Sequence, residues 1–339
     1  MNFKFFAARR LLVPGVLITL LFSPAAMAEW FKLERDVMGT RITVEVWAAD
    51  SGKARQCSMA VLKEMHRIDA VMSPFREDSE IALLNREAAK HPVKVGSELF
   101  RLIQRANEVA RLSAGAFDIT FASIGYKYDF RRKIKPAAEE IAQRLAAVDY
   151  HLIKMNAANH TLQFAREGVR IDLGGIAKGY AVDNGIKILK KCGIKNGLVT
   201  AGGDSRILGD RHGRPWMMGI RHPRQKNGVA VLLPLSDTAI STSGDYERYF
   251  IEKGVRYHHI INPQTGRPVA TTWSVSVIGP DATTTDALST AFFVLGAKKA
   301  LQLAERLKGI DAVIIDAHGQ THYSSGLMPP AARNRAAAH

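Results

Sequence analysis

The chain has 339 residues, of which 47% are hydrophobic and 23% charged, and its formal net charge is +15 at pH 7. These are the proportions of a globular protein, and no low-complexity tract, heptad run or internal repeat is visible, which excludes fibrous, coiled-coil and repeat proteins. The basic balance suits an anionic partner. We expect no nucleic acid among the partners, because there is no zinc-finger or RRM signature and no helix with densely spaced Arg and Lys.

The first 28 residues have the three parts of a secretory signal peptide. A basic n-region with three positive charges is followed by an apolar stretch over 11–22 and by the small-x-small sequence Ala26-Met27-Ala28. The apolar stretch is too short to span a bilayer. We therefore expect residues 1–28 to be cleaved, which leaves a mature chain of net charge +12 that begins near Glu29. We expect it to be soluble in the periplasm and to have no transmembrane span. A retained signal anchor is the alternative.

The first part of the mature chain is mainly helical by its apolar spacing. Alternation over Met38–Ala48 predicts a strand. Periods of three and four residues, with capping residues and terminating prolines or glycines, predict helices over Ser51–Met72, after Ser79, from Ser97 towards Gly115, and from Pro136 to Val148.

The remainder is dominated by short strands between Gly, Pro and Asn signals. Strands are predicted over 151–155, 161–165, 169–173, 197–203, 216–222, 229–235, 257–261, 274–279 and 312–316, and helices over 174–192, 283–295 and 297–307. Because helices cluster early and strands dominate later, the pattern predicts an α+β fold and not a doubly wound parallel sheet. We expect one domain over 29–330 and a disordered tail over 331–339.

Two cysteines, Cys57 and Cys192, both lie in apolar helical patterns. An oxidising compartment would permit a disulfide between them. Buried free thiols explain the same pattern equally well, so both alternatives stay open.

The segment from Val169 to Tyr180 combines a predicted strand, the sequence DLGG and the start of a helix. Gly174 and Gly175 allow a close backbone approach, the helix start offers free N–H groups, and Lys178 adds a positive charge. These features together could bind a phosphate group. A tight strand-to-helix turn with a surface lysine explains them equally well, and the segment is neither GxGxxG nor a P-loop.

Asp286 and Thr290 lie four residues apart on a predicted helix and so share one face. A carboxylate and a hydroxyl are oxygen ligands that suit Mg²⁺, which completes its shell with water and substrate phosphate. The competing interpretation is an ordinary helix start, capped by a threonine and favoured by the acidic residue.

The paired residues His258 and His259 precede an Asn-Pro-x-x-Gly turn. Neighbouring residues on a strand point to opposite faces, so this pair is poorly placed to bind one zinc ion. A single histidine could serve as general base or phosphate ligand. Three further turn-forming clusters, at 115–118, 202–204 and 241–244, could line a pocket, and there is no GxSxG or HExxH motif.

Eight segments together resemble, in the same order, those of the ApbE-like family of FAD:protein FMN transferases. They are MGT at Met38, MSPF at Met72, GAFDIT at Gly115, DLGGIAKGYAVD at Asp172, AGGD at Ala201, STSGDYERYF at Ser241, HIINPQTGRPV at His259 and DALSTA at Asp286. An ordered series over nearly the whole mature chain is far more specific than any one segment. The resemblance implies an α+β architecture of mixed or antiparallel sheets with helices packed around them (T-fold-like).

The resemblance also implies a site. Contacts to FAD would come from Met38, Phe75, Ala116, Phe117, Asp118, Asp172, Lys178 and Ile260. Mg²⁺ would be held by Asp286, Thr290 and the backbone carbonyl of Gly175. The reaction would be attack of a Thr or Ser hydroxyl of an acceptor protein, expected to be a subunit of a membrane redox complex, on the FMN-side phosphorus of FAD, with AMP leaving. His259 is the first candidate for the base and Asp286 the second.

The sequence departs from the common family pattern at three places. Phe75 stands where a tyrosine is frequent, the basic segment YKYDFRRKIK at 126–135 replaces a more apolar stretch, and the lipobox cysteine of many relatives is absent. Three alternative functions remain open on the sequence. The first is an FAD pyrophosphatase that uses water as acceptor, and the second is a non-catalytic periplasmic FAD-binding protein. The third is a basic structural protein that engages membrane lipids and binds no flavin.

Overall fold

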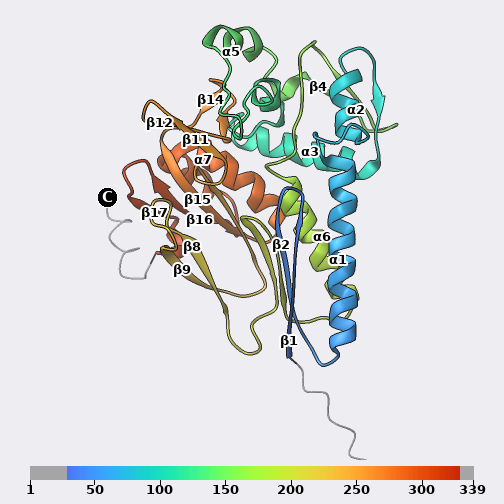
Figure 1. Cartoon of the computed structure of the whole chain (residues 1–339), viewed down its shortest axis with the longest axis vertical. Coiled ribbons are helices and arrows are strands. Elements are labelled where there is room, and N and C mark those ends of the chain that lie inside the picture. The colour runs from blue at the N-terminus through green and yellow to red at the C-terminus, as the bar shows by residue number, and fades with distance from the viewer. Residues whose placement is uncertain (1–28, 329–339) are drawn as a thin grey trace, which may run out of the picture.

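The computed structural model describes residues 29–328 (Figure 1). The expected signal peptide, 1–28, and the expected tail, 331–339, lie outside the described residues. The fold is α+β, as predicted: one large sheet carries three long helices on one face. Among the described residues, no helix is both long and apolar enough to cross a membrane.

The large sheet has eight strands in the order β1-β2-β6-β7-β10-β15-β16-β17, and every neighbouring pair is antiparallel. Short hairpins join several neighbours, so the sheet is built largely from contacts between segments close in sequence. The strands are β1 (Glu29–Val37), β2 (Thr40–Ala48), β6 (Gly197–Ala201), β7 (Asp204–Leu208), β10 (Ala239–Gly244), β15 (Thr272–Gly279), β16 (Asp311–Asp316) and β17 (Thr321–Tyr323).

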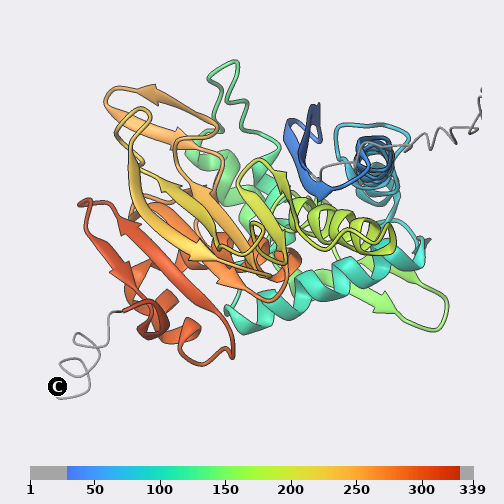
Figure 2. The same cartoon turned by 90° about the horizontal axis from the view of Figure 1, so that it is seen from below.

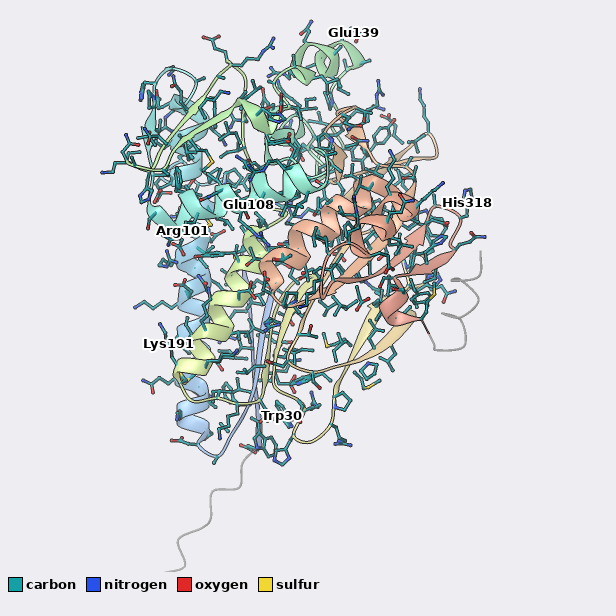
Figure 3. The ribbon with its side chains drawn as sticks, turned by 180° about the vertical axis from the view of Figure 1, so that it is seen from behind. Trp30, Arg101, Glu108, Glu139, Lys191 and His318 are labelled. Carbon is teal, nitrogen blue, oxygen red and sulfur yellow. A yellow bond between two sulfur atoms is a disulfide. The ribbon has the colours of Figure 1, made fainter. Side chains whose placement is uncertain are left out.

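Three helices, α1 (Ser51–Met72), α6 (Ala177–Lys191) and α7 (Ala282–Ala304), cover one face of this sheet. Figure 3 shows α1 and α6 side by side, with Lys191 at the far end of α6. The apolar stripe of α1 explains its position: Val61, Met65 and Ile68 are fully buried, at helical spacing. Burial of this stripe is the main force that holds α1 against the sheet.

A second group of elements lies at one end of the sheet, at the top of Figure 1. In Figure 3, Arg101 and Glu108 mark α3, which crosses there. The helices are α2 (Glu80–Glu87), α3 (Ser97–Leu112), α4 (Ala122–Gly125) and α5 (Ala138–Leu145), with 3₁₀ turns η1 (Ile119–Phe121) and η2 (Tyr150–Leu152). A three-stranded sheet of β3 (Val93–Lys94), β5 (Thr161–Phe164) and β4 (Ile153–Asn156) completes the group.

The opposite face of the large sheet is covered by the ribbon of β8 (Trp216–Arg221) and β9 (Val229–Leu235). Ile220 of this ribbon packs against Ile240 and Ile278 of the sheet. Two more ribbons pair β11 (Tyr249–Glu252) with β12 (Val255–His258), and β13 (Ile261–Asn262) with β14 (Arg267–Pro268); η3 (Ser325–Leu327) ends the described chain.

The strand predicted over 169–173 is wrong, because this segment belongs to no strand. Side chains satisfy part of its backbone instead, and Asp172 N donates to the carbonyl of Ile119 at 3.0 Å. The amide of Asn85 accepts from Ile171 N at 2.7 Å and donates to Ile171 O at 2.9 Å, and Ser123 Oγ accepts from Arg170 N at 3.0 Å. Alternating apolar residues therefore do not mark a sheet ladder here, because the backbone finds its partners outside a sheet.

Two boundaries follow from left-handed backbone. The strand expected from Met38 begins at Thr40, because Met38 (φ 56°) and Gly39 (φ 69°) form the turn between β1 and β2. Gly296, with φ 73° and ψ 167°, breaks the helical geometry of α7. That break confirms the predicted division between helices 283–295 and 297–307.

Cys57 of α1 and Cys192, which follows the last residue of α6, form a disulfide. The alternative of two free thiols is therefore wrong for the described structure. The bond cross-links the neighbouring helices α1 and α6, and Lys178 lies in the first turn of α6.

Candidate active site

The site is built where the start of α6 meets the start of α7. A side chain at Gly179 of α6 could not fit there, because a Cβ atom would lie 2.1 Å from the carbonyl oxygen of Ala282. The Asp183 carboxylate holds the two helices together by accepting hydrogen bonds from the N–H groups of Ala282 (2.9 Å) and Thr283 (2.8 Å). The cap of α7 is Asp281 and not a threonine, since Asp281 accepts from Thr284 N.

Asp286 of α7 is buried in this contact and is 2% exposed. Its Oδ2 accepts a hydrogen bond from the Gly179 backbone N–H at 2.9 Å. Lys178 Nζ lies 3.3 Å from both oxygens of Asp286 and 2.8 Å from Oδ2 of Asp204, so the ammonium bridges two buried carboxylates. Burial, together with the neighbouring Asp204, raises the pKa of Asp286. Burial alone would lower the pKa of Lys178, but the two carboxylates raise it above its ordinary value.

Lys178, Asp204 and Asp286 form a triad whose charges do not balance. With both carboxylates ionised, one ammonium faces two negative groups, and the cluster is short of one positive charge. A buried carboxylate without full compensation is costly. The positive charge of Lys178 is also committed to the protein itself. The arrangement therefore favours an added cation beside Asp286, and it makes Lys178 a poorer phosphate ligand than its sequence suggested.

The three expected metal ligands lie together. Because the Gly179 N–H is bonded to Asp286, the carbonyl of Gly175, four residues earlier, accepts no hydrogen bond from any described residue. A Cβ at Gly175 would lie 3.2 Å from Thr290 Oγ1 and 3.1 Å from the Phe117 ring, so Gly175 lies directly against Thr290. A carboxylate, a hydroxyl and an orphaned carbonyl are the oxygen donors that Mg²⁺ prefers. The residues present thus fit that ion.

Within residues 29–328 there is no group of three or more His, Cys, Asp or Glu that could hold a metal. A metal at this site would therefore depend on the Gly175 carbonyl and the Thr290 hydroxyl as well as on Asp286. Ser243 Oγ lies 3.4 Å from Thr290 Oγ1 and 2.8 Å from Ser289 Oγ, and so helps to orient the threonine.

A second set of groups faces the triad. Asp172 Oδ1 accepts from Gly174 N at 2.7 Å, and burial raises the pKa of Asp172 while Arg248 and Lys178 oppose the rise. Nδ1 of His259 is buried and has no hydrogen-bond partner among the described residues. Burial, and then the positive charges of Arg248 and Lys178, lower the pKa of His259 to about 3. His259 is therefore neutral at pH 7 and has a free ring nitrogen.

The two neighbouring histidines differ. His258 Nε2 donates to the carbonyl of Val269 at 2.7 Å, and its Nδ1 accepts from Ile260 N at 3.3 Å. Both ring nitrogens of His258 are thus used within the fold, which leaves His259 as the histidine available to a ligand.

Arg248 is a site residue that we did not predict. Its guanidinium is exposed and has no hydrogen bond or ion pair with any described residue. Its Nη2 lies 3.4 Å from the position of a Cβ at Gly39, in the turn between β1 and β2, and its carbonyl accepts from His259 N at 3.1 Å. Since the charge of Lys178 is already committed, Arg248 is the cation here that is free to bind an anion. It lies inside the STSGDYERYF match, but no local pattern distinguishes it from other surface arginines.

The residues expected to contact FAD differ in how far their side chains are exposed. Phe117 lies against Gly175, and Met38 is in the turn beside Arg248. Phe75, in the turn after α1, is 86% exposed, so its ring is open to stacking. Of the other expected contacts, Asp172 and Lys178 are half-buried, and three are buried: Ala116, Asp118 and Ile260.

Asp118 is already satisfied by the fold. Its carboxylate accepts hydrogen bonds from Thr120 N and Tyr150 N, both at 2.8 Å. Burial raises the pKa of Asp118. A contact to FAD from this segment would therefore come from the backbone more readily than from the carboxylate.

Two hollows lie elsewhere on the described surface. One, of about 400 Å³, is lined by α3, α6 and the start of α7, and includes Arg101, Asp183 and Thr283. The other, of about 700 Å³, lies between Leu112 and Arg306. None of the expected FAD or metal residues lines either hollow, so the chemistry of the cluster, and not the size of a hollow, identifies the site.

The ApbE family matches this chain over residues 38–314. The FAD:protein FMN transferase of Treponema pallidum is 33% identical over 86% of this chain and 86% of its own length, and that of Haemophilus influenzae is 32% identical over 76% and 77%. Among solved structures, the ApbE protein of Thermotoga maritima has a TM-score of 0.80 at 36% identity, with 87% of this chain and 97% of that chain covered. The flavin transferase ApbE of Vibrio cholerae has a TM-score of 0.79 at 29% identity, with 88% and 98% covered.

Proposed function

Since this chain belongs to the ApbE family and is an FAD:protein FMN transferase, we propose that it transfers FMN to a Thr or Ser hydroxyl of an acceptor protein in a Mg²⁺-dependent reaction that releases AMP. The observation that carries the proposal is the meeting of the Asp286 carboxylate, the Thr290 hydroxyl and the orphaned Gly175 carbonyl beside a cluster that is short of positive charge.

Asp286, Thr290 and the Gly175 carbonyl would hold the ion. Bound there, Mg²⁺ would neutralise charge on the FAD pyrophosphate. Lys178 holds Asp286 and Asp204 in place through its ion pairs with both carboxylates, and its charge opposes the rise in the pKa of Asp286. Its role in this account is therefore to position the metal ligand.

Arg248 is the group that we propose as pyrophosphate ligand from the protein. A guanidinium can bind phosphate oxygens through two parallel hydrogen bonds. Arg248 is free of other partners and lies beside the Met38–Gly39 turn. Phe75 is suited to stack on the flavin ring, because its side chain is almost wholly exposed, and Phe117 and Ile260 offer apolar contacts.

In the transfer step, the acceptor oxygen forms a bond to the FMN-side phosphorus, and the bond from that phosphorus to the bridging oxygen breaks. AMP leaves with that oxygen, and the hydroxyl proton passes to a base. His259 is suited to take it, because Nδ1 is unpartnered. Its pKa is held low partly by Arg248 and Lys178. A bound pyrophosphate would offset those positive charges and so raise the pKa towards the useful range.

We place the reaction in the periplasm, with an exported subunit of a membrane redox complex as acceptor. Two features support this location. The first 28 residues have the composition of a cleavable signal peptide, and the disulfide between Cys57 and Cys192 suits an oxidising compartment.

One incubation separates the proposed reaction from the two alternatives that involve FAD. The protein is mixed with FAD, Mg²⁺ and a threonine-containing acceptor domain, and both the acceptor mass and the released nucleotides are measured. Covalent flavin on the acceptor with an equal amount of AMP supports transfer. Free FMN and AMP in the absence of acceptor would indicate an FAD pyrophosphatase. FAD that is bound but unchanged would indicate a flavin-binding protein.

A further inference from the structure

The basic segment 126–135 forms a rigid projection. The Asp129 carboxylate accepts hydrogen bonds from the N–H groups of Arg131 (3.0 Å) and Arg132 (2.9 Å). The backbones of Asp129 and Ile134 pair as an isolated antiparallel bridge. The tip between them is therefore held in one conformation, with Lys133 at a left-handed φ of 57°. Figure 2 shows this loop beside the β11–β12 ribbon, where both project from the same side of the molecule.

Aromatic contacts anchor the projection to that ribbon. Tyr128 stacks on Phe130 at 5.8 Å between ring centroids, Phe130 meets Phe250 at 6.3 Å, and Phe250 stacks on Tyr257 at 5.1 Å. Lys135 forms an ion pair with Glu252 and lies over the Tyr257 ring at 4.3 Å. Four aromatic side chains thus fix a short loop that would otherwise be a mobile surface segment.

These contacts fix two tips, residues 131–134 of the loop and residues 251–255 of the ribbon, and both tips are cationic. Arg131, Arg132 and Lys133 are exposed, as is Lys253 at the turn of the ribbon, and their side chains make no hydrogen bond or ion pair with the described residues. The nearby acids are already used, since Asp129 binds backbone N–H groups and Glu252 pairs with Lys135.

Exposed apolar side chains lie on the same elements. Ile134 is 41% exposed, Ile251 is 56% and Val255 is 53%. Four like charges held close together repel one another and so oppose folding. The apolar side chains beside them remain in contact with water, so their surface adds no stability by burial. Such a surface is suited to a partner that is acidic and partly apolar.

The projection is fixed to the segment that carries His259. Strand β12 ends at His258, and the hydroxyl of Tyr128 donates to the Gly266 carbonyl at 3.0 Å, in the turn that follows His259 and Ile260. A partner bound to the tips is therefore held by the same part of the chain that offers the base. A lipid surface would explain the charges but has no hydroxyl that must reach His259.

We propose that the two tips, 131–134 and 251–255, form the docking surface for an acidic segment of the acceptor protein. The inference rests on the proposed transfer to a protein hydroxyl. Contacts to these cations steer the acceptor to the site and hold it there while its hydroxyl reaches the FMN phosphorus.

The test uses a fluorescent threonine peptide with Asp and Glu flanks and a matched peptide with Asn and Gln at those positions. Binding is measured by anisotropy for the wild type, for Arg131→Ser with Arg132→Ser and Lys133→Ser, and for a control with Lys298→Ser, Lys299→Ser and Lys308→Ser. The control residues are also exposed and unpaired among the described residues. Because the tip variant loses three exposed charge contacts, each of which contributes only modestly, we expect it to bind the acidic peptide about tenfold more weakly. The control should bind it like the wild type, and the Asn/Gln peptide should bind weakly to all three proteins.

Three outcomes would overturn the inference: equal binding of the acidic peptide by the wild type and the tip variant, a similar loss in the control variant, or wild-type binding to vesicles of anionic lipid but not to the acidic peptide. A weakened FAD affinity in the tip variant would also overturn it, because the tips would then serve FAD. The transferase proposal fails by a different result: the wild type binds the acidic peptide normally, but no acceptor carries covalent flavin. Melting temperatures of both variants should match the wild type, which confirms that they fold.

Discussion

The backbone N–H of Gly179 donates a hydrogen bond to Oδ2 of Asp286 at 2.9 Å, which ties the first turn of α6 to α7. The same bond removes the donor that would otherwise close the helix on the Gly175 carbonyl, and so exposes that oxygen beside the carboxylate. Gly179 thereby permits the close approach of the two helices and leaves the Gly175 carbonyl unpaired at the proposed metal site.

Replacement of Gly179 by Ala should destabilise the protein. In an ordinary helix this change stabilises by up to about 1 kcal/mol, but here the new Cβ would lie 2.1 Å from the Ala282 carbonyl oxygen. We expect a loss of about 1–3 kcal/mol or more in the free energy of unfolding, measured by urea denaturation. Gly219→Ala in β8, where the nearest atom is at an ordinary 3.6 Å, is the control. A Gly179→Ala variant as stable as the wild type would show that the helices are not in such close contact.

Replacement of Arg248 by Ala should weaken binding of FAD but not of riboflavin, which lacks phosphate. A hydrogen bond to a charged group contributes about 1.5–3 kcal/mol, so the dissociation constant for FAD should rise roughly 10–100-fold. Arg248→Lys should recover only part of the affinity, because an ammonium cannot bind in the same two-pronged way. The control is Arg55→Ala on α1, whose guanidinium lies over the Phe31 ring. If riboflavin and FAD weaken equally, Arg248 does not act on the pyrophosphate.

His259 should contribute to the loss of stability in acid. Its pKa is about 3 in the folded protein and about 6.5 in an unfolded chain. Between these values the unfolded chain binds more protons, so the stability contributed by neutral His259 is present above pH 6.5 and is lost as the pH falls towards 3, by up to about 1.4 kcal/mol per pH unit. His259→Gln should show a shallower fall of melting temperature from pH 6.5 to 4, while the exposed His318→Gln should follow the wild type. Parallel profiles for all three proteins would mean that His259 is not held neutral.

The disulfide should contribute to stability through the long loop that it closes. Cys57 and Cys192 are 135 residues apart, and disulfides of natural domains typically contribute about 2–5 kcal/mol. The double variant Cys57→Ala with Cys192→Ala should melt at a lower temperature than the wild type. Reductant should lower the melting temperature of the wild type and leave that of the variant unchanged. An effect of reductant on the variant would show that the shift does not come from this bond.

Much of the fold follows from local patterns. The stripe that includes Val61, Met65 and Ile68 predicted α1 over its full length, and the break in α7 falls at Gly296, between the two helices predicted there. Strand β10 was not predicted, because AISTSG has the composition of a turn. Its polar residues serve the packing, since Ser241 bonds Thr285 and Ser243 bonds Ser289 on α7. Strand β1 was also missed, because five charged residues hide its alternation at a sheet edge.

For the site, the sequence located the groups but not their interactions. Spacing along one helix placed Asp286 and Thr290 on the same face. Only the tertiary contact of α6 with α7 brings Gly175 to them. The pairing of Lys178 with Asp204 and Asp286 joins three distant segments, so no pattern in the chain could have shown that the charge of Lys178 is already committed. Arg248 was not predicted because its place beside the Met38–Gly39 turn also depends on a contact between distant segments.

The most direct test of the account is a Mg²⁺ titration of flavin transfer by the wild type and Asp286→Asn, with Asp281→Ala as a control that changes only the cap of the same helix. Covalent flavin on the acceptor is measured at each Mg²⁺ concentration, and chelation of the metal by EDTA supplies the zero point. The account predicts saturable activation of the wild type and of Asp281→Ala, no activity in EDTA, and at least a 100-fold loss in Asp286→Asn, in keeping with removal of a group that stabilises the transition state. Transfer by Asp286→Asn at the wild-type rate and with the same Mg²⁺ midpoint would contradict the assignment of the site.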